Sequence, residues 1–520
     1  MSVVVVGAGP VGLAMASELT RHGVRCRIID QSPAPATGTR ASALQARTLE
    51  ILDDMGVIQP ILEAGHRIHG AGIFAEGRRI LHFSFDELAS PYPFALDIPQ
   101  QETERILTAH LRTLGVEVER SATLTRIEQT ADGISLEIED HGNSSIKAAH
   151  VIGCDGARSA VRRLSAIPSE SIGPEETFLV ADVHADWGAP DDEWYFWFHE
   201  DGLFSLFPLG AGRYRAVVDV AGGTEGTEDE FRAAFADRGP KDARILEASR
   251  IFVYPVARGR ASTYRHGRVF IAGDAAHVQN PAGGQGMNTG IQDSYNLAWK
   301  LAMVLRGNAP DTLLDSYTAE RRPVARSVSA LTENFASIAS LRSPIPQGIR
   351  NRLIPVLAGF EVFEHRLVDR LAEISVNYRN SPAVGQFGRW YAAGPAAGDR
   401  APRVFDLLRG TRHVVLLFAA EHTEKEDVRG FQNIERYMRD GYGSEISTHL
   451  IARTEMSWSG PMILDHDGAA HHAYGAGVPC VYLIRPDGYV GFRSLSADPL
   501  PLLEYLNRVY EPPMQEIALA

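Results

Sequence analysis

The apolar and polar positions at the start of the chain predict a strand, a helix and a second strand. Residues 3–6 (VVVV) form a short β-branched run, typical of a strand buried on both faces. Apolar residues at spacings of three and four follow up to His22 and Gly23, and they indicate a helix that ends there. The run 24–30 (VRCRIID) predicts the next strand. The chain should therefore open with a βαβ-type unit.

Two later stretches, 66–96 and 177–220, show alternating, aromatic-rich segments such as ILHFSF and EWYFWF. This pattern predicts antiparallel strands of a second sheet. Alternation with a period of two should place Trp194, Phe196 and Phe198 on one face, and we expect one of the two faces to line an apolar pocket. Between the stretches, 102–114 predicts a helix, and three segments predict strands of the first fold: VEVE, ISLEIE and HVIGCDG.

Size and charge narrow the class of protein. The 520 residues exceed what one core supports, so two or three domains are expected. A net charge of -14 argues against nucleic acid and anionic membrane surfaces as partners. The cysteines, Cys26, Cys154 and Cys480, lack metal or CxxC spacing and favour a reducing cytoplasm. No apolar run suggests membrane insertion, and no basic start suggests a signal peptide.

The first chemical motif is the GxGxxG pattern of Gly7, Gly9 and Gly12, between the first strand and the first helix. The first glycine permits a tight turn, the second lets a phosphate approach the backbone, and the third lets helix and strand pack closely. A pyrophosphate would meet free N–H groups at the helix start. Asp30, at the end of the second strand, can accept hydrogen bonds from a ribose. This motif alone does not distinguish NAD from FAD.

Two further motifs carry a family resemblance. The segment GRVFIAGDAAHVQNPAGGQGMNTGIQDSYNLAWKL (267–301) and the segment VIGCDGARSAVR (151–162) resemble the GD and DG motifs of class A FAD-dependent aromatic hydroxylases. That family is typified by p-hydroxybenzoate hydroxylase, and the resemblance covers roughly the first 340 residues. It implies a Rossmann-like FAD-binding domain interleaved with an antiparallel-sheet substrate domain in an α/β fold.

The resemblance also implies roles for individual residues. Asp274 would hold the ribityl chain, and the glycines after it would let the backbone run under a flat ring at a positive helix end. Asp155 and Arg158 would serve the pyrophosphate and nicotinamide docking, Arg40 the pyrophosphate, Gln100 the ribityl chain, and Pro281 the oxygen side of the ring. The remaining residues implied at the ring are Gly284, Gly286, Met287 and Asn288.

The same resemblance implies the reaction. FAD would be reduced by NADPH or NADH, and a flavin C4a-hydroperoxide formed with dioxygen would hydroxylate a phenolic or polyketide-type aromatic substrate. The sequence contains no recognisable Ser/His/Asp or Cys/His nucleophile pattern, so the cofactor should supply the chemistry. Two alternatives stay open: a flavin reductase or dehydrogenase acting on a non-aromatic compound, and a catalytically silent flavin-binding protein.

We expect the domains to follow these motifs. The FAD-binding domain comprises 1–65, 97–165 and 262–343, and the substrate sheet comprises 66–96 and 166–261. A helical linker covers 344–395. Residues 396–520 resemble the thioredoxin-like appendage of the phenol and polyketide hydroxylase branch, notably in GVPCVYLIRPDGYVGFR. The absence of CxxC argues against thiol exchange and favours packing or a homodimer.

Overall fold

The computed structural model describes residues 2–35, 43–130, 133–140, 142–173, 175–280, 284–339, 361–388, 394–402 and 406–511. The chain forms two compact units. The first comprises Met1–Ser17, Arg25–Ser294 and Ala325–Ile374, and the second comprises Glu18–Val24, Tyr295–Val324 and Ser375–Ala520. The division into three domains expected from the sequence stays a prediction.

The first unit contains a six-stranded sheet, four of whose strand pairs are parallel. β1 (Val3–Val6) pairs with β2 (Cys26–Ile29) on one side and with β12 (His150–Gly153) on the other. All four valines of β1 are buried, which explains their continuous apolar run. The remaining strands are β8 (Val118–Glu119), β21 (Val269–Ile271) and the antiparallel β20 (Arg265–His266).

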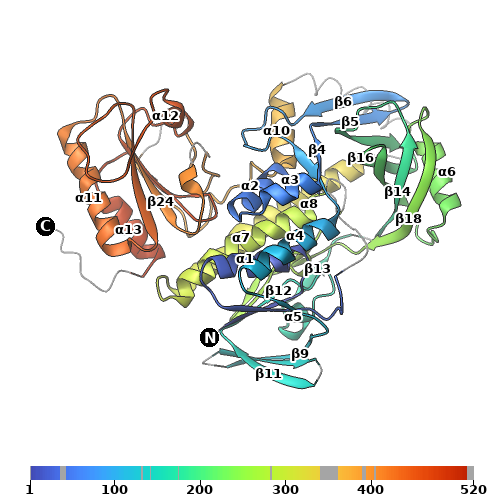
Figure 1. Ribbon diagram of the computed structural model, residues 1–520, viewed down its shortest axis with the longest axis horizontal. Coiled ribbons are helices and arrows are strands. Elements are labelled where there is room, and N and C mark those ends of the chain that lie inside the picture. Colours follow the sequence, from blue (N-terminus) through green and yellow to red (C-terminus); the bar gives the residue numbers. More distant parts are fainter. Residues whose placement is uncertain are drawn as a thin grey trace. The chain divides into compact units, whose positions relative to one another are not determined.

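A seven-stranded sheet in the first unit joins segments far apart in the sequence. Figure 1 shows β5 (Gly70–Ala75) and β6 (Arg78–Ser84), in blue, in the same layer as the green strands. The other strands, in sheet order, are β18 (Arg244–Val256), β14 (Glu176–Asp186), β17 (Arg213–Val220), β16 (Gly202–Gly210) and β15 (Glu193–His199). β15 pairs with β5 in parallel, whereas the other neighbours are antiparallel. The predicted second sheet is therefore present.

The aromatic alternation of β15 is confirmed, whereas the expectation that one of its faces lines an apolar pocket stays a prediction. Trp194, Phe196 and Phe198 belong to one hydrophobic cluster, and Tyr195 and Trp197 belong to another. The second cluster is completed by residues of α6 (Glu228–Arg238). Both faces of β15 thus pack into core, and Phe207 of β16, in the same cluster as Trp194, reaches the wall of the cavity described below.

Smaller elements complete the first unit. The segment ISLEIE forms β10 (Gly133–Glu139) of a separate three-stranded antiparallel sheet with β9 (Thr123–Thr130) and β11 (Asn143–Ala148), and not a strand of the parallel sheet. Two further three-stranded sheets are formed by β3 (Ala43–Leu44), β7 (Ala95–Asp97) and β4 (His66–Ile68), and by β13 (Ser169–Ser171), β19 (Gly259–Ala261) and β22 (His277–Val278). The shorter helices are α2 (Ala46–Asp54), α3 (Ile58–Ala64), α5 (Ala160–Leu164), η1 (Gly273–Ala275) and α10 (Glu361–Leu371).

Four longer helices carry most of the remaining chain before residue 340. They are α1 (Pro10–Arg21), α4 (Gln100–Thr113), α7 (Gly286–Leu305) and α8 (Asp315–Ala339). The chain leaves α7 at Leu305, and the short turn η2 (Asp311–Leu314) precedes α8. Among the described residues, no helix is long and apolar enough to cross a membrane.

The second unit has a six-stranded sheet with apolar clusters on both faces. In β24 (His413–Ala419), Val415 and Leu417 belong to one cluster, and Leu416 and Phe418 belong to the other. The other strands are β23 (Gly385–Phe387), β28 (Val490–Ser494), β27 (Cys480–Ile484), β25 (Ile446–Ala452) and β26 (Met462–Leu464). The α-helices that follow β23 are α11 (Lys425–Tyr442), α12 (Ala469–Ala473) and α13 (Leu500–Val509), and η3 (Asp406–Leu408) is a short 3-10 turn. Its likeness to thioredoxin stays a prediction.

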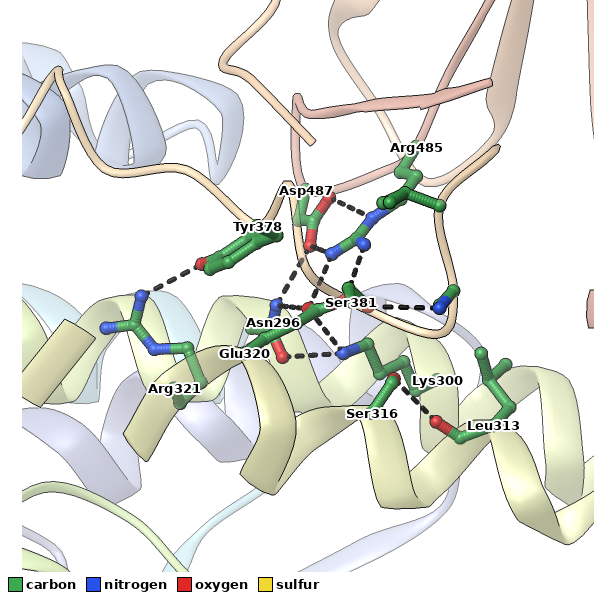
Figure 2. Close-up of polar contacts among 12 residues, drawn as sticks. Asn296, Lys300, Leu313, Ser316, Glu320, Arg321, Tyr378, Ser381, Arg485 and Asp487 are labelled. Carbon is green, nitrogen blue, oxygen red and sulfur yellow. Dashed lines mark hydrogen bonds and ion pairs between the residues drawn. The ribbon is translucent and has the colours of Figure 1, made fainter. Parts of the chain in front are cut away.

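The second unit also contains a buried ionic cluster, formed by Lys300, Glu320, Arg485 and Asp487 (Figure 2). Lys300 Nζ lies 2.7 Å from Glu320 Oε2, and Arg485 Nη1 lies 2.7 Å from Glu320 Oε1. Arg485 Nε also donates to Asp487 Oδ1 over 3.0 Å. Two cations and two anions therefore neutralise one another inside the unit.

Candidate active site

A cavity of about 720 Å³ in the first unit collects most of the residues that the sequence motifs single out. It is lined from the loop after β1, past β2, α4 and η1, to the seven-stranded sheet. The predicted residues along its wall are Gly7, Gly9, Asp30, Gln100, Asp155, Arg158, Asp274, Gly284, Gly286 and Met287. Segments more than 250 residues apart thus meet at one cavity. Arg40 and Pro281 lie outside the described residues.

The loop after β1 is shaped by its three glycines in different ways. Gly7 has φ 100°, and a Cβ there would lie 2.4 Å from the carbonyl oxygen of Cys154. A Cβ at Gly12 would lie 1.9 Å from the carbonyl oxygen of Gly7, so helix α1 can approach the loop only with glycine at this position. A Cβ at Gly9 would meet nothing within 4 Å. Gly9 thus leaves open space at the start of α1.

Acidic side chains line the same end of the cavity. Asp30 Oδ2 accepts a 2.6 Å hydrogen bond from the Ala8 N–H, and Asp30 Oδ1 accepts one of 2.7 Å from the Ser32 N–H. A carboxylate offers about four lone-pair sites, so Asp30 can accept further bonds. Gln100 donates to Glu104 Oε1 over 2.7 Å. Burial raises the pKa of Glu104, a cavity residue that no motif indicated.

Asp155 caps a short helix beside the cavity. Its Oδ2 accepts hydrogen bonds from the N–H groups of Ala160 (2.6 Å) and Val161 (3.1 Å), and its Oδ1 accepts one from Ser159 Oγ (2.5 Å). The side chain is therefore committed to the start of α5, which holds the cavity edge in place. Arg158 is exposed at this edge.

A buried pair of side chains, Asp293 and His277, holds the turn that carries Asp274. Asp293 Oδ2 accepts a 3.0 Å hydrogen bond from the Gly273 N–H and lies 2.7 Å from His277 Nε2. Both side chains of the pair are almost completely buried. Gly273 itself has φ 59°. The pair fixes the direction in which Asp274, half-buried, presents its carboxylate.

The start of α7 borders the cavity with a second open glycine. Gly284 has φ 64°, and a Cβ there would lie 2.9 Å from Ala43 Cβ. A Cβ at Gly286, the first residue of α7, would meet nothing within 4 Å. The positive end of a helix dipole is thus exposed to the cavity.

Asn288 lies outside the wall of the cavity, although Met287 beside it is part of the wall. Its Nδ2 donates to the carbonyl oxygens of Ala43 (2.9 Å) and Gly284 (2.7 Å), and its Oδ1 accepts from the Gln45 N–H (2.9 Å). The side chain therefore ties strand β3 and the glycine segment to α7, which supports the cavity from outside.

Glu373 also supports the start of α7 through hydrogen bonds, and no sequence motif indicated this role. This buried residue has φ 57°, a left-handed conformation that is rare outside glycine. Its carboxylate accepts hydrogen bonds from Thr289 Oγ1 (3.1 Å) and from Gln292 Nε2, both on the first turns of α7. No local sequence pattern predicts these contacts, because the partners of Glu373 are more than 80 residues away in sequence.

The far end of the cavity is walled by the seven-stranded sheet. Phe207, Val217, Phe252 and Tyr254 supply apolar surface there. Arg215 lies among them with only 3% of its surface exposed, and its Nη2 donates to Asp182 Oδ1 over 2.7 Å. A carboxylate of the neighbouring strand β14 allows this cation to be buried.

The shape and donors of the cavity fit FAD. Open glycines stand at the starts of two helices, Gly9 before α1 and Gly286 in α7, where backbone N–H groups can meet a phosphate and a ring. Neighbouring glycines that cannot accept a Cβ keep these two positions accessible. Carboxylates at Asp30 and Asp274 stand where hydroxyl groups of a bound nucleotide can donate. The fold and the site thus define a flavoprotein oxidoreductase.

Comparisons with known proteins give the family. Residues 1–332 match the family described as "FAD binding domain". The chain is 33% identical to 6-methylpretetramide 4-monooxygenase of Streptomyces rimosus, over 95% of this chain and 90% of that protein. It is 32% identical to pentachlorophenol 4-monooxygenase of Sphingobium chlorophenolicum, over 95% and 94%. The solved ternary complex of aklavinone-11 hydroxylase with FAD and aklavinone has 25% identity and a TM-score of 0.76, and the match covers 98% of both chains.

The chain therefore belongs to the FAD-binding family of aromatic-compound monooxygenases. It is an FAD-dependent enzyme, and NAD(P)H and dioxygen are the co-substrates general to this family. The resemblance inferred from the three motifs is confirmed.

Proposed function

We propose that this enzyme hydroxylates a phenolic or polyketide-type aromatic compound. The observation that carries the proposal is the continuity of one cavity from the open glycine Gly9 to the aromatic wall of the seven-stranded sheet. A cofactor and a flat apolar substrate can meet in such a space. A silent flavin-binding protein would need no substrate room at the sheet.

We assign the cofactor to the end of the cavity that the motifs form. Gly9 and the first turn of α1 would take the pyrophosphate, Asp30 a ribose and Asp274 the ribityl chain. Gly286 and Met287 would lie at the ring, where the start of α7 favours negative charge. When bound, FAD supplies hydride acceptance and the activation of dioxygen.

The protein's own residues would orient and ionise the substrate. Phe207 and Phe252 line the sheet end, where their apolar rings would exclude water and stack on a flat substrate. A phenol is a better nucleophile as phenolate, and the positive charge of Arg215 favours the ionised form. Asp182 holds that guanidinium in the wall.

Three finer expectations from the sequence stay predictions. They are assembly as a homodimer, location in the cytoplasm and the choice between NADPH and NADH as reductant. Size determination of the purified protein and parallel assays with both nicotinamides address the first and the last.

A substrate screen tests the proposed function. The holoenzyme is mixed with NADPH or NADH and with phenols, naphthols or hydroxylated polycyclic aromatics, and nicotinamide oxidation is followed with product analysis. We expect at least one aromatic compound to accelerate oxidation and to be hydroxylated. Reduction of an alkene without any hydroxylation would instead support the reductase alternative.

A matched pair of variants tests the cofactor assignment. Asp274→Ala should weaken FAD binding, because Asp274 lines the cavity and we assign its carboxylate to the ribityl chain. Asp140→Ala removes an exposed carboxylate in a turn that does not line the cavity and should leave FAD binding unchanged. Equal FAD affinity in the two variants would contradict the role assigned to Asp274.

A further inference from the structure

Glu373 is a buried carboxylate that lies beside the first two turns of α7. Only 1% of its surface is exposed. It accepts hydrogen bonds from Thr289 Oγ1 over 3.1 Å and from Gln292 Nε2. Gly286, the first residue of α7, borders the cavity one turn before Thr289. Because water scarcely reaches the carboxylate, its charge acts on the start of α7 with little screening.

The turn that carries Glu373 has two further attachments near the cavity. Gln285, which lines the cavity, donates from Nε2 to the Leu371 carbonyl oxygen over 3.2 Å. The Arg47 backbone N–H donates to the Ala372 carbonyl oxygen, also over 3.2 Å. Glu373 itself has φ 57°, which is unfavourable for a residue with a side chain. These contacts therefore hold the carboxylate against α7 in a backbone conformation that only its surroundings can maintain.

We propose that the carboxylate of Glu373 lowers the reduction potential of the bound flavin. This inference rests on the proposed function, which assigns the flavin ring to the start of α7 at Gly286 and Met287. Reduced flavin carries negative charge, and the positive end of α7 stabilises that charge. The carboxylate repels it and makes reduction less favourable. Glu373 is not part of the cavity wall, so it is a positioning residue that acts through α7 and through its charge.

The sizes of the two charges show that this effect is not a minor one. A helix terminus acts as about half a positive charge, whereas an ionised carboxylate carries a full negative charge. The group is buried, so dissolved salt screens it much less than it screens a surface charge. A lower potential makes the reduced cofactor a stronger reductant of dioxygen, the co-substrate general to this family.

Two substitutions of Glu373 separate its charge from its hydrogen bonds. Glu373→Gln removes the charge and keeps the shape. The Oε1 atom of Gln292 is buried and has no hydrogen-bond partner among the described residues, so a rotated Gln292 amide can accept from the introduced amide. Glu373→Gly removes the side-chain hydrogen bonds and relieves the backbone. The control, Glu364→Gln, makes the same change of charge in α10 at a residue that does not line the cavity.

The flavin potential of each holoenzyme is measured by reductive titration against a reference dye, and FAD affinity is measured by titration of the apoprotein. We expect a higher potential in Glu373→Gln with FAD affinity near that of the wild type, and no shift in Glu364→Gln. Glu373→Gly should raise the potential too and should weaken FAD binding about tenfold, because α7 loses a support. Wild-type potentials in both Glu373 variants would overturn the proposal.

Gly286→Ala distinguishes that result from a wrong placement of the flavin ring. Its methyl group would enter open space at the start of α7, so FAD affinity should fall if the ring lies there. Wild-type FAD affinity in Gly286→Ala would overturn the placement and this inference with it. Neither measurement needs an aromatic substrate, so a failure to find any hydroxylated product leaves both results decisive.

Discussion

Glu320 accepts hydrogen bonds from two nitrogen atoms of Arg485, and no part of either side chain is exposed to solvent. Burial alone would raise the pKa of Glu320, but Arg485 and Lys300 together hold it well below its ordinary value. Burial lowers the pKa of Lys300 to about 8, even though Glu320 opposes the shift. The two anions and two cations of the buried ionic cluster are thus mutually dependent (Figure 2).

Breaking the buried ionic cluster should destabilise the second unit. In Glu320→Gln, Arg485 and Lys300 lose the anion between them, and removing one partner of a buried pair costs about 3–5 kcal/mol. Thermal unfolding followed by calorimetry measures the loss. The control, Glu421→Gln, removes an exposed partner of Arg453 and should have little effect. Equal unfolding temperatures for the two variants would show that the cluster contributes no stability.

The same carboxylate predicts an acid dependence of stability. The pKa of Glu320 is lower in the folded than in the unfolded protein, where it is near 4.5. As the pH falls below about 4.5, the unfolded chain binds a proton first, so stability decreases. Melting temperatures between neutral pH and pH about 3 should therefore fall more steeply for the wild type than for Glu320→Gln. Parallel curves would contradict this explanation.

The second and third glycines of the GxGxxG pattern, Gly9 and Gly12, should respond differently to the same change. Gly9→Ala places a methyl group in open space, so the apoprotein should fold normally while FAD affinity falls. Gly12→Ala forces a methyl group against the Gly7 carbonyl oxygen and should reduce the yield of folded protein. Circular dichroism of the apoproteins and FAD titration separate the effects. A Gly9→Ala protein with normal FAD affinity would argue against phosphate binding there.

Asn288 should stabilise the protein by supporting the wall of the cavity, and it should not contact the cofactor. Asn288→Ala removes three protein hydrogen bonds, and groups left unpaired in the interior cost about 1–3 kcal/mol each. The apoprotein should then unfold at a lower temperature even without FAD. If only FAD affinity changed and apoprotein stability did not, direct contact with the cofactor would be the better explanation.

The sequence predicted features that depend on neighbours along the chain. The glycine loop, the strand before it and the turn at Asp274 are local patterns, and the comparisons confirm the family that they indicate. The two-faced alternation of Trp194 and Tyr195 was equally local. The covering of the Tyr195 face by α6 was not local, because it depends on residues more than 30 positions further along the chain.

Residues whose roles depend on distant partners could not be predicted. Arg215 is buried only because Asp182, 33 residues earlier, lies on the adjacent strand. Glu373 supports α7 from a segment without any motif.

The origin of the oxygen in the product tests the proposed hydroxylation most directly. An aromatic compound that accelerates nicotinamide oxidation is incubated with the holoenzyme under heavy-isotope dioxygen, and the product is analysed by mass spectrometry. A monooxygenase should give a product that carries one labelled oxygen atom. A product without label, or nicotinamide oxidation that yields only hydrogen peroxide with every aromatic compound, would contradict it.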